Sequence, residues 1–320
     1  MDSFRPDILT YINALKRDVD ESLDIYSEPK PGTPKRLSEA MRYSLLAPGK
    51  RIRPLLTLLA GDLCGATRQQ SLPAACAIEM VHAYSLIHDD LPAMDDDGLR
   101  RGRPTCHVQF DEGTAILAGD ALLALAFETL SHHVKPQSLA GDCCAVLSRA
   151  AGAANLVGGQ ADDLDAADNP ALSCDYDASV KFLESIHLRK TGAMIQAALR
   201  LGGLVGGVDE EHICCLEEYG VNFGLAFQIT DDLLDWIGDE EIVGKRLRKD
   251  KDSNKLTFPS LIGVDASRCE AAEKVQKACL ALDIFKPLIE SEPTNPRGIS
   301  RRLVHDTLVA LARYLVERRN

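Results

Sequence analysis

Two aspartate-rich segments, each following an apolar stretch with helical spacing, constrain this chain more than any other feature. The first, residues 87–97, holds five aspartates and follows the apolar positions of residues 78–87. The second, residues 231–235, has the sequence Asp-Asp-Leu-Leu-Asp and ends a longer apolar stretch. Carboxylates this close together repel one another unless solvent or a cation neutralises them. The first segment alone fits either a solvated acidic turn or a metal site, and the second segment favours the metal site.

Helical periodicity along almost the whole chain predicts an all-α fold. The sequence contains no alternating segment typical of strands, no glycine-rich dinucleotide motif and no linker long enough to divide it. At 320 residues the chain can bury a large core, so we predict a single domain over residues 1–320. The expected helices up to and including the second acidic segment cover residues 6–26, 37–46, 54–63, 73–87, 114–133, 139–157, 180–201 and 209–236. Gly158-Gly159 is expected to interrupt the helical pattern.

Composition excludes several classes of function. The formal net charge of −12 argues against binding to nucleic acid or to anionic lipid, both of which need a basic surface. Ten cysteines with no Cys-x-x-Cys pair and no zinc spacing are typical of reduced thiols in the cytosol. The first 20 residues contain no apolar secretion segment, and no apolar run approaches the ~18 to 20 residues of a membrane helix. We therefore expect a cytoplasmic protein without membrane insertion.

The spacing within the second acidic segment suits a divalent cation. Asp231 and Asp235 are four residues apart and share a helix face, and Asp232 lies one turn before Asp235 on a neighbouring line. Mg²⁺ takes a few carboxylates, waters and substrate phosphate oxygens as ligands. The alternative, a polar face on a surface helix, is weakened by the surrounding apolar residues. The first segment lacks the ligand spacing of an EF-hand. Together the two segments predict Mg²⁺ held between facing helices.

Short basic clusters indicate what such metals would bind. Residues 50–53 (Lys-Arg-Ile-Arg) follow Pro48-Gly49, and Arg100-Arg101 lies between glycines. Dense cations beside glycine or proline suit phosphate recognition through charge-assisted hydrogen bonds. Taken singly, each cation is more often a solvated charge. Further candidates are Lys190, Lys245 and Lys255. Basic clusters and paired aspartates in an acidic chain together predict a polyphosphate ligand with Mg²⁺.

These motifs resemble those of the short-chain trans-isoprenyl diphosphate synthases. Residues 82–95 (HAYSLIHDDLPAMD), followed by Leu-Arg-Arg-Gly at 99–102, are similar to the first aspartate-rich motif of that family. Phe227-Gln228 with residues 231–235 is similar to the second. Further matches, in the family's order, are Gly-Lys-Arg-Ile-Arg-Pro at 49–54, Gly-Gly-Gln at 158–160 with Asp163, and Lys-Thr-Gly at 190–192. The resemblance extends from about residue 37 to the C-terminus and is strongest to bacterial members that form farnesyl diphosphate.

The resemblance implies the isoprenoid synthase fold, a bundle of about ten or more helices around a central active-site cavity. It implies a prenyltransferase that condenses isopentenyl diphosphate with dimethylallyl or geranyl diphosphate. The products would be farnesyl diphosphate and pyrophosphate, formed by Mg-assisted ionisation, alkene addition and proton loss. It also implies several Mg²⁺ ions that bridge aspartates and diphosphate, and a homodimer.

The resemblance also implies a role for individual residues. The Mg²⁺ ligands would be Asp89, Asp90, Asp95, Asp231, Asp232 and Asp235. The diphosphate of isopentenyl diphosphate would be bound by Lys50, Arg53, His82 and Arg101. The allylic diphosphate would be bound by Arg100, Lys190, Thr191, Gln228, Lys245 and Lys255. Of these, Lys190, Thr191 and Gln228 would lie near the developing allylic cation and are the catalytic candidates.

Product length is expected to depend on the helix before the first aspartates. Positions one and two helical turns before Asp89 share a face and would line the floor of the elongation pocket, and Tyr84 and Ser85 are the nearest candidates. A bulky Tyr84 is expected to block growth beyond farnesyl; the alternative is an ordinary core aromatic. The chain departs from the family pattern at three places, with Ala47-Pro48 for glycines, Arg189 for a frequent His and Asn254 for a Gly. None of these removes a metal ligand.

Other functions remain open at this point. The product could be geranyl or geranylgeranyl diphosphate. A class I terpene cyclase shares the aspartate motifs, but it needs no second diphosphate site, against which the basic residues assigned to isopentenyl diphosphate argue. A catalytically silent helical subunit typically lacks one aspartate cluster, and both are intact here.

Overall fold

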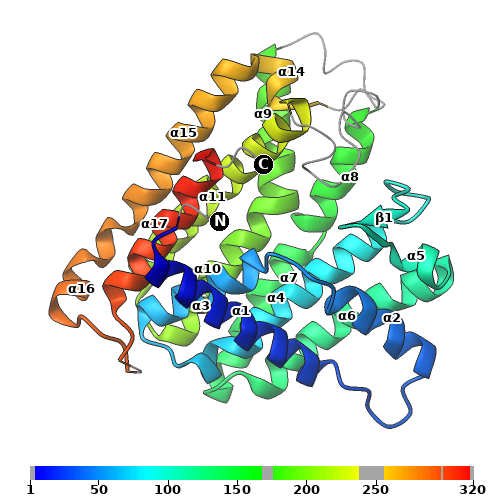
Figure 1. The fold of residues 1–320 in the computed structure, drawn as a ribbon, viewed down its shortest axis with the longest axis horizontal. Helices are drawn as coiled ribbons and strands as arrows, with labels where there is room; N and C mark the ends of the chain where they lie inside the picture. The colour runs from blue at the N-terminus through cyan, green and yellow to red at the C-terminus, as the bar shows by residue number, and fades with distance from the viewer. Residues whose placement is uncertain (1–3, 168–175, 238–255, 297, 318–320) are drawn as a thin grey trace.

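The computed structural model describes residues 4–167, 176–237, 256–296 and 298–317. It is built of helices with one small hairpin, which confirms the predicted all-α fold (Figure 1). The α-helices are α1 Pro6–Tyr26, α2 Lys35–Leu45, α3 Ile52–Cys64, α4 Arg68–Asp89, α5 Cys106–Gln109, α6 Glu112–His133, α7 Ala140–Ala151, α8 Leu156–Ala167, α9 Tyr176–His187, α10 Ala193–Gly206, α11 Glu210–Ile237, α14 Phe258–Ile262, α15 Val264–Ala281, α16 Lys286–Ser291 and α17 Arg301–Glu317. The short elements are the antiparallel strands β1 Leu99–Arg100 and β2 Arg103–Pro104, the 3₁₀-helices η1 Gln137–Leu139 and η4 Leu282–Phe285, and the π-helix η3 Leu188–Gly192.

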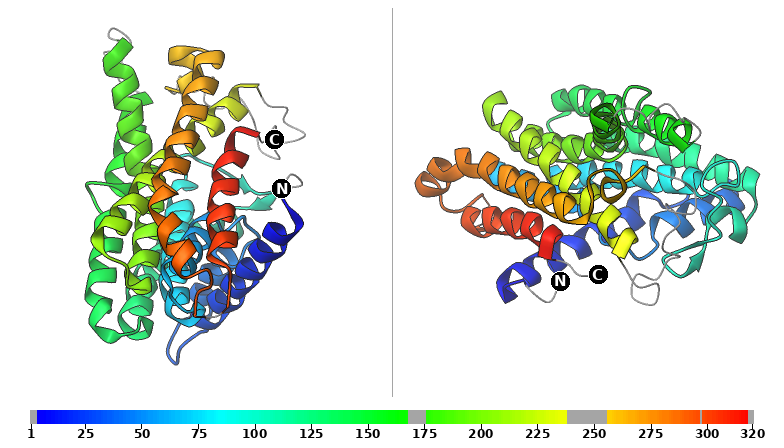
Figure 2. Two further views of the ribbon diagram at one scale, coloured as in Figure 1. Left: turned by 90° about the vertical axis from the view of Figure 1, so that its left-hand side faces the viewer. Right: turned by 90° about the horizontal axis from the view of Figure 1, so that it is seen from above.

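The centre of the bundle consists of α3, α4 and α10 (Figure 1). In α3 every residue from Pro54 to Cys64 is buried, as expected of a helix that is apolar on all sides. Close crossing of α3 and α10 depends on Gly202, because a Cβ there would lie 2.6 Å from the Cβ of Ala60. The main hydrophobic cluster runs from Ile8 of α1 to Leu315 of α17. Figure 2 shows these two terminal helices on the same side of the bundle.

Several predicted helix boundaries were wrong for identifiable reasons. The helix before the first aspartates begins at Arg68 and not at Pro73, because Thr67 and Gln70 form a capping box ahead of it. Gly158-Gly159 lies inside α8 and does not interrupt it. A Cβ at Gly159 would lie 2.5 Å from the backbone nitrogen of Lys190, so glycine here serves a close approach between α8 and η3.

Helix α6 bears on the expectation about membranes. Among the described residues, α6 is the one helix that is long enough and apolar enough to cross a bilayer. The sequence predicted no membrane-length helix here because Asp120 and Glu128 interrupt the apolar run of α6. One face of α6 packs along α4, while Ile116 and Leu117 are 44% and 58% exposed. Core helices of soluble proteins meet the same two criteria, so length and composition alone decide nothing.

Candidate active site

The first aspartate segment folds back onto the end of α4. The helix ends at Asp89, and the loop after Pro92 returns so that the backbone N–H of Asp95 donates to the carbonyl oxygen of Asp89 (2.9 Å). Pro92 has no backbone N–H to donate, so the helix cannot continue through it and the chain turns here. Burial raises the pKa of Asp89 to about 6, with Lys190 opposing the shift and Asp95 adding to it. The loop therefore concentrates negative charge at a desolvated helix end.

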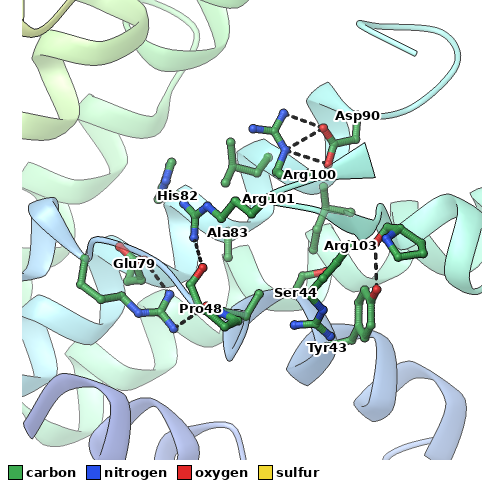
Figure 3. Close-up of a pocket in the computed structure, with 15 residues that line it drawn as sticks. Tyr43, Ser44, Pro48, Glu79, His82, Ala83, Asp90, Arg100, Arg101 and Arg103 are labelled. Atoms are coloured by element: carbon green, nitrogen blue, oxygen red, sulfur yellow. Dashed lines mark hydrogen bonds and ion pairs between the residues drawn. The ribbon is translucent and has the colours of Figure 1, made fainter. Parts of the chain in front are cut away.

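Asp90 forms an ion pair with the hairpin. The residue is 3% exposed, and its carboxylate accepts two hydrogen bonds from Nε of Arg100 (2.9 and 3.0 Å) and one from Nη2 (2.6 Å). Burial raises the pKa of Asp90, although the guanidinium of Arg100 opposes that shift. Figure 3 shows this pair at the edge of a pocket between α2, α4 and the β1–β2 hairpin. Arg100, a predicted ligand of the allylic diphosphate, is thus held next to the first aspartates.

The second aspartate segment lies on the last turns of α11. Asp231 and Asp235 are partly exposed, whereas Asp232 is buried. The Asp232 carboxylate accepts a hydrogen bond from the backbone N–H of Phe258 (3.0 Å) and lies 3.5 Å from Nε2 of His187. Asp232 therefore joins the end of α11 to α14 and α9.

The six predicted ligands fit a hard divalent cation by their chemistry. All are carboxylates, the oxygen donors that Mg²⁺ prefers. The raised pKa of Asp89 marks a buried negative charge that the nearby cations do not balance, which a divalent cation would relieve. Among the residues that the structure describes, however, no three acidic, His or Cys side chains are gathered closely enough to hold a metal ion.

A second group of basic side chains surrounds one buried carboxylate, Glu79 of α4. Arg53, Arg101 and His82 all lie within electrostatic range of each other or of Glu79. Burial and the neighbouring arginines lower the pKa of His82 well below its usual value. The Nε of Arg53 is buried without a hydrogen-bond partner. Positive charge in excess of one carboxylate, with an unused donor, is the environment that an anion would occupy.

Arg51 is a supporting residue for this group. Its backbone is in the left-handed region (φ 54°), which turns its side chain inward while Lys50 stays exposed. The guanidinium donates to Asp20 (2.8 Å), Glu79 (2.8 Å) and the carbonyl of Ala47 (3.0 Å). The supporting roles of Arg51 and Glu79 were not predicted from the sequence, although Glu79 is a lone acidic residue inside an apolar helix.

The unusual Pro48 takes part in the same arrangement. Its carbonyl oxygen accepts a hydrogen bond from Nη1 of Arg101 (2.7 Å; Figure 3). The guanidinium passes so close to Gly49 that a Cβ there would lie 3.2 Å from its Cζ. Replacing a glycine by proline at position 48 is compatible with this contact because only the carbonyl is used.

The three catalytic candidates meet where α8, η3 and α11 pack together. The predicted helix over residues 180–201 is broken by η3, a π-helical turn of the kind that often marks functional sites. Within it, Lys190 Nζ lies 2.7 Å from Asp163 of α8, and the hydroxyl of Thr191 donates to Oε1 of Gln228 on α11. Lys190 also lies within electrostatic range of Asp89. The structure therefore brings Lys190 close to the first aspartate segment and pairs Thr191 with Gln228 next to it in the chain.

The remaining predicted residues divide into two groups. Tyr84 and Ser85 are partly buried on α4, and the Ser85 hydroxyl donates to the His82 carbonyl (2.9 Å). Burial raises the pKa of Tyr84, and the charges of Asp89 on α4 and Asp120 on α6 add to the shift. Lys245, Lys255 and the unusual Asn254 lie outside the described residues.

Comparisons with known proteins identify relatives of a single family. A family model described as polyprenyl synthetase matches residues 34–283. The chain is 44% identical over 273 residues to a geranylgeranyl diphosphate synthase of Cyanophora paradoxa, covering 85% of this chain and 88% of the relative. It is 41% identical over 311 residues to a farnesyl diphosphate synthase of Escherichia coli (strain K12), covering 96% and 97%. A solved FPP/GFPP synthase from Zymomonas mobilis superposes with a TM-score of 0.80 at 35% identity, covering 97% and 98%.

Proposed function

The chain belongs to the polyprenyl synthetase family and is a trans-prenyltransferase with the isoprenoid synthase fold, and we propose that its main product is farnesyl diphosphate. Relatives at similar identity are named as farnesyl and as geranylgeranyl diphosphate synthases, so relatedness alone does not choose the product. The observation that carries the proposal is Tyr84. Its partly buried ring lies one turn before Asp89, where a growing prenyl chain would extend.

The allylic substrate is proposed to bind with its diphosphate between the two aspartate segments. Mg²⁺ would be held by Asp89, Asp90, Asp95, Asp231, Asp232 and Asp235, and when bound it supplies Lewis-acid polarisation of the leaving diphosphate. Arg100 and Lys190 add positive charge toward the same group. Asp90 and Asp232 already have protein partners, so they would also keep the hairpin and α14 in place. Lys245 and Lys255 are proposed to contact this diphosphate as well.

The ionised substrate needs stabilisation at carbon as well as at oxygen. The Thr191–Gln228 pair fixes two side-chain dipoles next to Lys190, where oxygen atoms can face a developing allylic cation. Isopentenyl diphosphate is proposed to bind through Lys50, Arg53, His82 and Arg101, and the buried Nε of Arg53 supports an anion there. Holding both substrates converts alkene addition into an effectively intramolecular step. The proton released afterwards is assigned to the departed pyrophosphate and to no side chain.

Product analysis tests this function directly. Purified protein with Mg²⁺ is incubated with isopentenyl diphosphate and either dimethylallyl or geranyl diphosphate, and the dephosphorylated products are chromatographed. We expect pyrophosphate release and farnesol from both primers, and loss of both when the metal is chelated. Geranylgeraniol as the main product would replace the farnesyl assignment. A cyclic hydrocarbon formed without isopentenyl diphosphate would indicate a terpene cyclase, and no pyrophosphate at all would indicate a silent subunit.

Replacing Tyr84 by alanine is expected to lengthen the product. The substitution removes the ring that would close the pocket floor, so the fraction of geranylgeranyl and longer products should rise several-fold. The measurement is the ratio of chain lengths in the dephosphorylated mixture. Tyr84→Phe keeps the ring and is the matched control, for which farnesol should remain the main product. An unchanged ratio in Tyr84→Ala would make Tyr84 an ordinary core aromatic.

We also propose a cytoplasmic homodimer that does not insert into membranes. The cysteines in the described part of the chain are free thiols, which fits a reducing compartment. Ile116 and Leu117 leave an apolar strip exposed on α6, which a second copy would cover. Sedimentation at micromolar concentration should give twice the 34.8 kDa mass of one chain, and a single-chain mass would contradict the dimer.

A further inference from the structure

We propose that His88 is a positioning residue for product length, which acts by holding the ring of Tyr84 in the closed position. The inference deepens the proposed function and rests on it. His88 lies one helical turn after Tyr84 on α4, and the two rings meet edge to face with centroids 5.1 Å apart and planes at 81°. Edge-to-face contact is a preferred geometry for aromatic pairs, so each ring restricts the rotamer of the other.

His88 is itself fixed by helix α6. Its Nε2 lies 3.0 Å from the carbonyl oxygen of Ile116. Because a carbonyl oxygen can only accept, Nε2 carries the proton and donates this hydrogen bond to α6. A helical carbonyl has a second lone pair, and this contact is compatible with its intrahelical bond. The imidazole thus links α6 to the end of α4.

Gly119 makes this position possible. A Cβ built on Gly119 would lie 2.6 Å from Cδ2 of His88, and the three nearest atoms to it all belong to that ring. Gly119 is buried, and so are its α6 neighbours Ala115 and Ala118. The imidazole therefore occupies a notch in α6 that only a residue without a side chain leaves open.

The consequence for Tyr84 follows from what surrounds it. Its ring is partly buried against the hydrophobic core and contacts the ring of His88, within electrostatic range of Asp89 on α4 and Asp120 on α6. His88 in turn lies against α6. Without the imidazole, the ring of Tyr84 can rotate toward α6 and open the floor to a longer prenyl chain. The specificity of the enzyme would then depend on three positions, of which only Tyr84 would touch the product.

A double-variant cycle tests the proposal. His88→Ala is expected to raise the ratio of geranylgeraniol to farnesol several-fold, and to leave that ratio unchanged when introduced into Tyr84→Ala. Gly119→Ala should displace the ring and raise the ratio in the wild-type background, but should have no effect in the His88→Ala background. His88→Phe, which keeps the ring and loses the hydrogen bond, should retain farnesol as the main product. The ratio compares products of one reaction, so a general loss of rate or of stability would not change it.

Three results would overturn the inference. The first is a wild-type ratio in His88→Ala when Tyr84→Ala does lengthen the product. The second is an equal further increase when His88→Ala is added to Tyr84→Ala, since the two residues would then act independently. The third is an unchanged ratio in Tyr84→Ala itself. Failure of the proposed function is distinct from all three, because it is seen in the wild-type protein alone, which would then form geranylgeraniol as its main product or no prenyl product.

Discussion

Replacing Asp89 by asparagine is expected to lower kcat by at least about 10²-fold, the scale of losing one preorganised electrostatic group in an active site. The substitution keeps the shape of the side chain and removes its charge at the buried end of α4, where the pKa of the carboxyl is already raised to about 6. The Mg²⁺ concentration needed for half-maximal rate should also rise. The measurement is steady-state kinetics with the allylic primer at a series of Mg²⁺ concentrations.

Asp96→Asn is the matched control for this experiment. Asp96 belongs to the same acidic segment but is exposed, and its backbone is left-handed (φ 50°), a conformation that asparagine tolerates well. We expect kcat and the Mg²⁺ requirement to stay within about twofold of wild type, as for an ordinary surface substitution. If Asp89→Asn behaved like this control, the first segment would be a solvated turn and its role as a metal ligand would be wrong.

Replacing Arg51 by alanine is expected to reduce the free energy of unfolding by about 3 kcal/mol, the lower end of the cost of breaking a buried ion pair from one side. The side chains of Arg51 and Glu79 are each 5% exposed and meet at 2.8 Å, so the substitution leaves a buried carboxylate without its main hydrogen-bonded partner. We take the lower end because Arg53 and Arg101 remain within electrostatic range of Glu79. The measurement is the midpoint of unfolding in urea at an unchanged slope.

The same variant should affect one substrate more than the other. Arg51 supports the backbone turn between Lys50 and Arg53, so KM for isopentenyl diphosphate should rise more than KM for the allylic primer. Arg17→Ala is the control, since Arg17 is 69% exposed and its carboxylate partners lie 3.9 Å away. Such a surface pair is worth at most about 1 kcal/mol. Equal unfolding midpoints for the two variants would exclude a supporting role for Arg51.

Features governed by local chemistry were predictable from the sequence. The end of α4 at the first aspartates follows from Pro92, which cannot donate a backbone hydrogen bond. The all-α class follows from the apolar periodicity, and the order of the motifs pointed to the correct family. The roles assigned to the aspartates and cations remain predictions, although the structure places Asp89 within electrostatic range of both Asp95 and Lys190.

Features that depend on a distant partner were not predictable. A glycine such as Gly159 predicts a break in a helix. It lies inside α8 because the backbone of Lys190 is too close to leave room for a side chain. The π-helical turn at residues 188–192 does not change the apolar periodicity of the sequence, so it could not be predicted from that periodicity. Glu79 is a single acidic residue in an apolar helix, and its meaning depends on Arg51 being turned inward by a left-handed backbone. The contact of His88 with Gly119 joins two helices whose relative placement no local pattern specifies.

Helix α1 has a consequence for how far the functional unit extends. It precedes the part of the chain that matches the family model, yet Asp20 on it is a counterion of Arg51. Asp18 on the same helix bonds Arg68 at the start of α4, and the Tyr11 hydroxyl bonds buried Asp62 of α3. A shortened chain beginning at residue 34 would therefore lose Asp20, one of the two acidic partners of Arg51. Because Arg51 adjoins Lys50 and lies two residues before Arg53, both proposed ligands of isopentenyl diphosphate, shortening the chain at that end is expected to weaken the binding of this substrate.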